Sequence, residues 1–167
     1  MVFFMKAEER LINSFYSCFR SRDWRGMGEV YHPEVVFYDP VFGNLEGPEV
    51  GAMWAMLLGG DAVRGGKGRS TELDLQFGGI KGEDGYWSCD WVARYVFPAT
   101  GRAVVNRGKA MFKFEDGKII EHQDSFSFWR WSRQALGWKG WFFGWTSLLQ
   151  RPVRRRARRA LERFMKK

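Results

Sequence analysis

Three long segments in which apolar and polar residues alternate constrain the fold of this 167-residue chain more than any other feature. The alternation has the two-residue period of a β-strand with one buried face. Short turn signals between the segments, Pro98-Ala99-Thr100-Gly101 and Glu115-Asp116-Gly117-Lys118, are typical of hairpins. We therefore expect an antiparallel series of strands at residues 71–77, 86–97, 103–114 and 119–128.

The first third of the chain is helical in character. Apolar residues recur at helical spacing over residues 7–20, and Asp23 is placed to cap a second helix that runs to Val30. A short strand at 35–38 and a third helix at 49–58 follow. Helices followed by long antiparallel strands, without regular strand–helix alternation, predict an α+β fold.

Four polar residues are expected on the buried faces of these strands. The alternation places Asn106 inward on one strand and Asp39 inward on another. On the last strand it places His122 and Asp124 inward, together with Ile120. A carboxylate in an apolar interior must be hydrogen-bonded, paired or protonated, because burying an isolated charge is costly. An aspartate beside a histidine in such a place has the chemistry of a general base.

Each of these residues also has a purely structural interpretation, which the sequence leaves open. Asp39 can cap a turn with its carboxylate. His122 and Asp124 can form a structural ion pair, or face solvent if the strand register slips by one residue. Asn106 can be a hydrogen-bonded core amide, and Tyr16 a core aromatic residue.

Several short motifs follow one another in a telling order along residues 7–130. They are Phe15-Tyr16, Arg22-Asp23-Trp24, the segment 31–42 that ends in Asp39-Pro40-Val41-Phe42, Leu45-Glu46-Gly47, Trp91-Val92-Ala93-Arg94-Tyr95 and the segment 114–124. In this order they resemble the nuclear transport factor 2-like superfamily, and within it the SnoaL-like and ketosteroid isomerase-like proteins. The resemblance implies a cone-shaped α+β barrel, in which a strongly curved antiparallel sheet wraps around the N-terminal helices and encloses a cavity. It also implies a homodimer that packs through the sheet.

The resemblance implies roles for individual residues as well. Asp39 matches the Asp-Pro aspartate with which steroid isomerases remove a proton next to a ketone, and Tyr16 is the nearest candidate for their hydroxyl donor. Their second donor, a neutral carboxylic acid, falls near Ala110, which cannot donate. Asp124 matches the acidic base of SnoaL-like polyketide cyclases, with His122 close by.

These residues support an enzyme of the proton-transfer type, isomerase-like or cyclase-like, that acts on a small apolar carbonyl compound. Asp124 or Asp39 would remove the proton. His122, with Asn106 or Tyr16, would stabilise the enolate oxygen. No cofactor and no metal is expected for this chemistry.

A non-catalytic module that binds a small ligand or lipid is the alternative function. The missing acid near Ala110 favours it, and so does an aromatic cavity lining expected from Trp91, Tyr95 and Phe112. Fold alone does not decide between the two classes.

The positive charge of the chain is concentrated at its C-terminal end. The formal net charge is +8, and residues 151–167 hold nine Lys and Arg against the single acidic residue Glu162, so residues 1–150 sum to zero. We expect a domain at 1–150, with an aromatic segment at 131–150, followed by a basic helix at 151–167. A glycine-rich segment at 59–70 is expected to be a loop.

The aromatic segment and the basic helix together suggest reversible binding to an anionic membrane. The contact residues would be Trp138, Trp141, Arg154, Arg155 and Arg158. In the alternative, the tryptophans pack on the body or on a second copy and the arginines are solvated. Nucleic acid is disfavoured because no base-reading motif accompanies the charge. The start of the chain lacks the features of a signal peptide, and we expect a cytoplasmic protein, either soluble or peripheral to a membrane.

Overall fold

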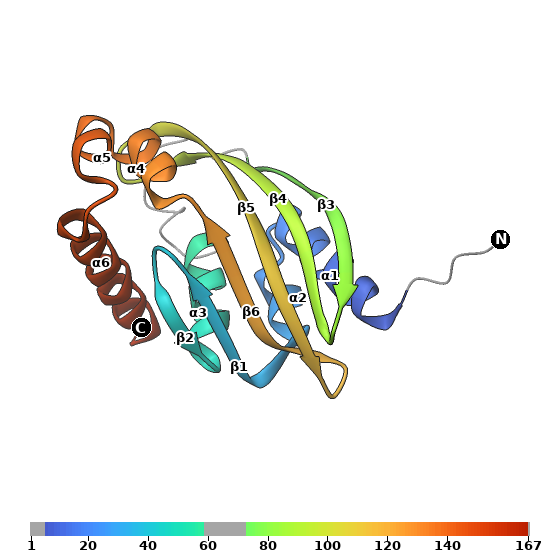
Figure 1. Ribbon diagram of the computed structural model, residues 1–167. Helices are drawn as coiled ribbons and strands as arrows, with labels where there is room; N and C mark the ends of the chain where they lie inside the picture. The colour runs from blue at the N-terminus through green and yellow to red at the C-terminus, as the bar shows by residue number, and fades with distance from the viewer. Residues whose placement is uncertain (1–5, 59–72, 167) are drawn as a thin grey trace.

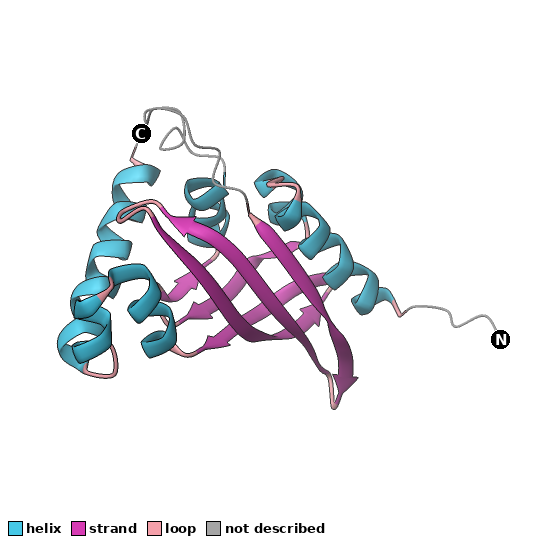
Figure 2. Ribbon diagram, turned by 90° about the horizontal axis from the view of Figure 1, so that it is seen from above, coloured by secondary structure: helices cyan, strands magenta, loops and turns pink. Residues whose placement is uncertain are grey.

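A strongly curved six-stranded sheet forms one wall of the molecule, and the helices pack on it or beside its edge (Figure 1; Figure 2). The computed structural model describes residues 6–58 and 73–166, so the glycine-rich segment at 59–70 and the first two residues of the strand expected at 71–77 lie outside it. The strands are β1 (Tyr31–Asp39), β2 (Gly43–Glu46), β3 (Asp74–Glu83), β4 (Tyr86–Phe97), β5 (Arg102–Glu115) and β6 (Lys118–Phe126). The helices are α1 (Ala7–Arg20), α2 (Trp24–Glu29), α3 (Pro48–Leu58), α4 (Phe128–Leu136), α5 (Trp138–Phe143) and α6 (Ser147–Met165).

The strands lie in the order β2-β1-β6-β5-β4-β3. Strands β3 to β6 form the expected antiparallel series, but β1 runs parallel to β6. The α+β class is therefore confirmed, while the sheet is mixed and unclosed rather than wholly antiparallel. A parallel pair needs a long connection, and most of the sheet lies between β1 and β6 in the sequence.

The N-terminal helices form as the sequence predicts and pack on the inner face of the sheet. Helix α1 has the predicted bounds, and it buries Ile12, Phe15 and Tyr16. The Asp23 side chain caps α2 by accepting a hydrogen bond from the Gly26 N–H at 3.0 Å. The Phe15 ring meets Phe112 of β5 edge to face, which fixes α1 against the sheet.

A β-bulge in β6 changes the expected register at its start. Phe114 of β5 pairs with Ile119, whereas Lys113 pairs with Glu121, so Ile120 is the extra residue. Ile119 is fully buried and Ile120 only partly so, and the prediction that Ile120 faces inward is wrong. Beyond the bulge the alternation holds, and His122 and Asp124 are buried as predicted.

The outer face of the sheet is the polar surface expected from the sequence. On β5, Arg107, Lys109 and Lys113 alternate with the inward residues and are exposed. Val105 and Met111 on the same face are each 38% exposed. The homodimer implied for this face stays a prediction.

The aromatic segment after β6 is helical, which its composition did not indicate. Residues 128–143 form α4 and α5, and α6 begins at Ser147, ahead of Pro152. The Ser127 side chain caps α4 by accepting a hydrogen bond from the Arg130 N–H at 3.3 Å. Helices α4 and α5 touch where Gly140 meets the backbone of Ser132, a contact too close for any Cβ atom.

Candidate functional site

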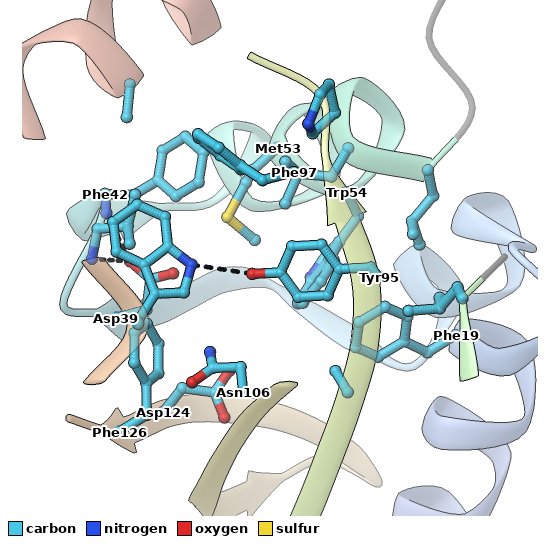
Figure 3. Close-up of a pocket in the computed structure, with 18 of the residues that line it drawn as sticks. Phe19, Asp39, Phe42, Met53, Trp54, Tyr95, Phe97, Asn106, Asp124 and Phe126 are labelled. Atoms are coloured by element: carbon cyan, nitrogen blue, oxygen red, sulfur yellow. Dashed lines mark hydrogen bonds between the residues drawn. The ribbon is translucent and has the colours of Figure 1, made fainter. Parts of the chain in front are cut away.

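A cavity of about 460 Å³ lies between the inner face of the sheet and the helices α1, α3, α4 and α6. This volume suits a small organic ligand. Its walls are mainly aromatic and aliphatic, as the close-up in Figure 3 shows. The apolar lining includes Phe19, Phe42, Met53, Trp54, Phe97 and Phe126.

Besides Arg22 and Arg156, five polar side chains interrupt this apolar lining. They come from α1, β1, β4, β5 and β6, and they are Tyr16, Asp39, Tyr95, Asn106 and Asp124. Figure 3 shows Asn106 and Asp124 side by side, with Asp39 and Tyr95 around the same space. The fold thus gathers three of the four polar residues that the strand alternation predicted, Asp39, Asn106 and Asp124, into one site.

Asp124 is held in place by a tryptophan from a strand two positions away. The Trp91 Nε1–H of β4 donates to Asp124 Oδ1 of β6 at 2.9 Å. Strand β5 lies between them, and its Gly108 lets the indole cross, because a Cβ atom there would lie 2.5 Å from Trp91. The second carboxyl oxygen of Asp124 has no hydrogen bond from the residues that the structure describes.

His122 lies behind Asp124 and does not line the cavity. Its Nδ1 atom is 2.7 Å from the Tyr31 hydroxyl, and that hydroxyl accepts a hydrogen bond from Trp54 Nε1 at 3.2 Å. Burial raises the pKa of Tyr31 well above its ordinary value, so Tyr31 is a neutral donor. We therefore assign the Tyr31 proton to the bond with Nδ1. With Nδ1 as the acceptor, the ring N–H is at Nε2, which lies 3.5 Å from Asp124 Oδ1 but makes no hydrogen bond to the described residues.

Asp39 is the last residue of β1. It both caps a turn and lines the cavity. Its Oδ1 atom accepts hydrogen bonds from the backbone N–H groups of Val41 at 2.9 Å and Phe42 at 2.5 Å, which form a turn. The same side chain lines the cavity. Burial raises the pKa of Asp39 to about 7, and the nearby Asp124 carboxylate adds to the rise, while the two N–H groups and Arg154 oppose it.

The two tyrosines and Asn106 are potential donors to a ligand. Burial raises the pKa of Tyr95 to about 12, and its hydroxyl accepts from Trp131 Nε1 at 2.9 Å, the dashed bond to Tyr95 in Figure 3. Its own proton is left for another partner. The Tyr16 hydroxyl is buried with no hydrogen-bond partner in the described residues, and burial raises its pKa well above the ordinary value. Asn106 is also buried, at 8% exposure.

Phe112, expected in the cavity lining, lies deeper. It is fully buried, with its ring 4.4 Å from the His122 ring, measured between centroids. It supports the site from behind. Trp91 and Tyr95 line the cavity as expected.

The predicted anion-contact residues divide into two groups. Trp138, Trp141 and Arg155 are exposed. Arg154 and Arg158 turn toward the body, where they donate to the carbonyls of Pro40 at 3.2 Å and Asn44 at 2.6 Å. Within the described ranges, no helix is long and apolar enough to cross a membrane.

Sequence reasoning missed several residues of the site. Tyr31 and Trp54 position His122, and Trp131 holds Tyr95. Helix α6 also contributes to the cavity wall, through Val153, Arg156, Ala157 and Ala160. Helical spacing on α6 marks Val153, Ala157 and Ala160 as one face, but it does not say what that face covers. In the same described part of the chain, no group of three or more His, Cys, Asp or Glu residues could hold a metal ion.

Comparisons with known proteins agree with this architecture. A family profile described as the SnoaL-like domain matches residues 12–122, well over half of the chain. The chain belongs to the SnoaL-like domain family. Among curated proteins, none matches the sequence.

Solved structures similar to this SnoaL-like protein share its fold at low sequence identity. A nuclear transport factor 2-like protein of unknown function from Burkholderia pseudomallei has a TM-score of 0.63 at 16% identity, with 78% of this chain and 98% of that chain covered. A hypothetical protein from Catenulispora acidiphila with a ketosteroid isomerase-like fold has a TM-score of 0.61 at 11% identity, over 75% and 91% of the two chains. An LEH-like epoxide hydrolase from Mycobacterium tuberculosis has a TM-score of 0.56 at 17% identity, over 76% and 87%.

Proposed function

We propose that this protein binds a small, mainly apolar carbonyl compound in its cavity and catalyses proton transfer at the carbon next to the carbonyl group. The observation that carries the proposal is the pair of carboxyl groups, Asp39 and Asp124, in one apolar cavity with different hydrogen-bond environments. Two titratable groups with such different surroundings are typical of an acid and a base that share one reaction.

Asp124 is the base in this proposal. Its Oδ1 atom accepts a hydrogen bond from the Trp91 N–H, and the Nε2 atom of His122 lies 3.5 Å from the same oxygen. Its other oxygen is left to accept a proton from the substrate carbon. His122 acts only through Asp124, because it does not line the cavity.

Asp39 and the neighbouring donors stabilise the enolate oxygen that forms. With its pKa raised to about 7, Asp39 keeps a proton on a substantial fraction of molecules near neutral pH. That proton, the Tyr95 hydroxyl and the Asn106 amide give the developing charge three donors. The proton that Asp124 takes is returned to another carbon of the substrate or to solvent, so the step needs no oxidant and no second substrate.

The test uses β-tetralone, an apolar cyclic ketone, and follows exchange of its α-hydrogens for deuterium in heavy water by NMR. We expect exchange to be faster with the wild type than in buffer, and Asp124→Asn to lose about 100-fold or more. Asp39→Asn should lose less, because Tyr95 and Asn106 remain. Asp90→Asn is the matched control, since Asp90 is exposed on the outer face of the sheet.

The result that would overturn the proposal is a wild-type exchange rate no faster than that of Asp124→Asn. Binding is measured in parallel by quenching of tryptophan fluorescence, since Trp54, Trp91 and Trp131 line the cavity. Tight binding of β-tetralone without exchange would favour the alternative, a binding module. The observation behind that alternative is Ala110, opposite Asp124 on β5, where no side chain can donate.

A further inference from the structure

The described surface carries one dense group of exposed apolar side chains, outside the cavity. It lies on α5, the turn that follows it and the start of α6, and its members are 45% to 75% exposed. We name it the aromatic surface. Its residues are Trp138, Trp141, Phe142, Phe143, Trp145 and Leu148.

A cluster of exposed apolar side chains is uncommon on a monomeric soluble protein. Single exposed apolar residues are ordinary, but clustered ones mark a contact with another body. The cluster is also held in position. Trp129 Nε1 donates to the Trp141 carbonyl at 3.3 Å, and the Arg133 guanidinium lies 4.8 Å from the Trp141 ring centroid.

Helix α6 continues the aromatic surface as a row of positive charge. At about 100° per residue, Leu148, Arg151, Arg155 and Arg159 fall on one stripe, followed by Lys166. All five are exposed. Glu162, the only acidic residue of α6, is exposed on the same stripe between Arg159 and Lys166, so four basic residues against one acidic residue leave the stripe a net charge of +3. We name the four basic residues of this stripe the cationic row.

The opposite side of α6 is fixed to the body. Leu161 is buried there, and Ala157 packs against the main core. Arg154 and Arg158 donate to the carbonyls of Pro40 and Asn44, and Arg158 also pairs with Glu49 at 3.5 Å. The helix is therefore held so that the cationic row faces away from the protein, as its place at the edge of the molecule in Figure 1 and Figure 2 allows.

We infer that the aromatic surface and the cationic row together dock on an anionic lipid bilayer, with α6 lying along the membrane plane. Tryptophan favours the headgroup level, and Lys and Arg beside it are attracted by anionic lipid. A second copy is a poor match, because symmetric pairing would set one cationic row against another and residues 1–150 carry no net charge. An anionic bilayer meets both halves of the surface at once.

Docking brings the cavity close to the lipid. Val153, Ala157 and Ala160 of α6 form part of the cavity wall. With the outer side of α6 on the membrane, only the width of one helix, about 10 Å, separates the cavity from the headgroups. The docked protein is thus placed to take an apolar ligand from the bilayer, a consequence that does not depend on which reaction follows.

The experiment is flotation of the full chain with phosphatidylcholine vesicles, with or without about one third phosphatidylglycerol. We expect flotation only with the anionic vesicles, and its loss as salt rises from about 50 to 500 mM. The double substitution Arg155→Gln with Arg159→Gln should weaken binding about 25-fold, at about fivefold for each charge. The double substitution Trp138→Ser with Trp145→Ser should reduce flotation even at low salt.

Matched control variants carry the same changes on the outer face of the sheet. They are Arg107→Gln with Lys109→Gln, and Val105→Ser with Met111→Ser, and both should float like the wild type. Circular dichroism checks that each variant is folded.

Equal flotation with neutral and anionic vesicles, no flotation, or equal loss in the control variants would overturn the inference. If the protein is a dimer in lipid-free solution and Trp138→Ser with Trp145→Ser makes it a monomer, the aromatic surface contacts a second copy instead. If the protein binds single-stranded RNA in a salt-sensitive way and does not float, the cationic row contacts nucleic acid.

Discussion

The Nε2 atom of His122 lies 3.5 Å from Oδ1 of Asp124, and the other nitrogen of the ring ends a chain of hydrogen bonds that begins at Trp54. Trp54 donates to Tyr31, and Tyr31 bonds the other ring nitrogen of His122. The order of these bonds decides that the ring N–H on the Asp124 side is at Nε2. A residue that never touches the cavity, Tyr31, therefore aims an N–H group at the carboxylate that does.

Replacing Tyr31 with Phe should disturb the site without changing its shape. The Nδ1 atom of His122 and the indole N–H of Trp54 would each lose a buried partner, which costs about 1–3 kcal/mol in the free energy of unfolding. The His122 proton can then move to Nδ1, and deuterium exchange into β-tetralone should slow while its dissociation constant stays the same. Tyr38→Phe on the same strand is the control, and unchanged exchange in Tyr31→Phe would argue against the relay.

The raised pKa of Asp39 makes stability depend on pH. The unfolded chain ionises Asp39 at about pH 4, whereas the folded protein does so at about pH 7. Below pH 4 both states hold the proton, so the folded protein bears no penalty there. As pH rises from about 4 to about 7, the unfolded state alone loses the proton, and the folded protein is destabilised by up to about 1.4 kcal/mol per pH unit.

Urea unfolding of the wild type beside Asp39→Asn measures this penalty. Asn keeps an oxygen for the Val41 and Phe42 N–H groups but does not titrate. The wild-type free energy of unfolding, less that of the variant, should fall between about pH 4 and pH 7 and stay level above it. A difference that is constant across this range would show that Asp39 is not held in its protonated form.

Gly108→Ala tests how Trp91 reaches Asp124. An added Cβ would lie 2.5 Å from the Trp91 ring and 2.7 Å from the Ser125 carbonyl oxygen, so the indole must move. We expect about 1–3 kcal/mol of destabilisation and slower exchange into β-tetralone. Gly78→Ala is the control, because nothing lies within 4 Å of a Cβ there. Trp91→Phe, which keeps a ring but removes the N–H, should slow exchange with a smaller loss of stability.

Strand periodicity was enough to find most of the polar cavity residues. It placed Asn106 and Asp124 inward, with His122 behind them, because burial of one sheet face imposes a two-residue rule. The rule failed at Ile120, since a bulge depends on the partner strand and not on the strand's own sequence. The predicted bounds of β4 and α1 were right, because a turn signal follows β4 and the helical spacing of apolar residues marks α1.

Contacts between distant segments could not be predicted in this way. Tyr31 is 91 residues from His122, and Trp131 is 36 residues from Tyr95, so no local pattern joins them. Helices α4 and α5 were missed because tryptophan and phenylalanine have no strong helix preference and glycines interrupt the run. The contribution of α6 to the cavity depends on how that helix docks, which only the folded chain decides.

Replacing arginine with glutamine should have different effects on the two sides of α6. Arg158→Gln removes a 2.6 Å hydrogen bond to Asn44 and the pairing with Glu49, so it should loosen the helix and cost about 1 kcal/mol in the free energy of unfolding. Arg155→Gln lies on the exposed side and should leave stability unchanged while weakening flotation with anionic vesicles. Amide hydrogen exchange of residues 147–165 reports the first effect directly, because a loosened helix exchanges faster. Equal protection of this helix in the two variants would mean that Arg158 does not anchor it.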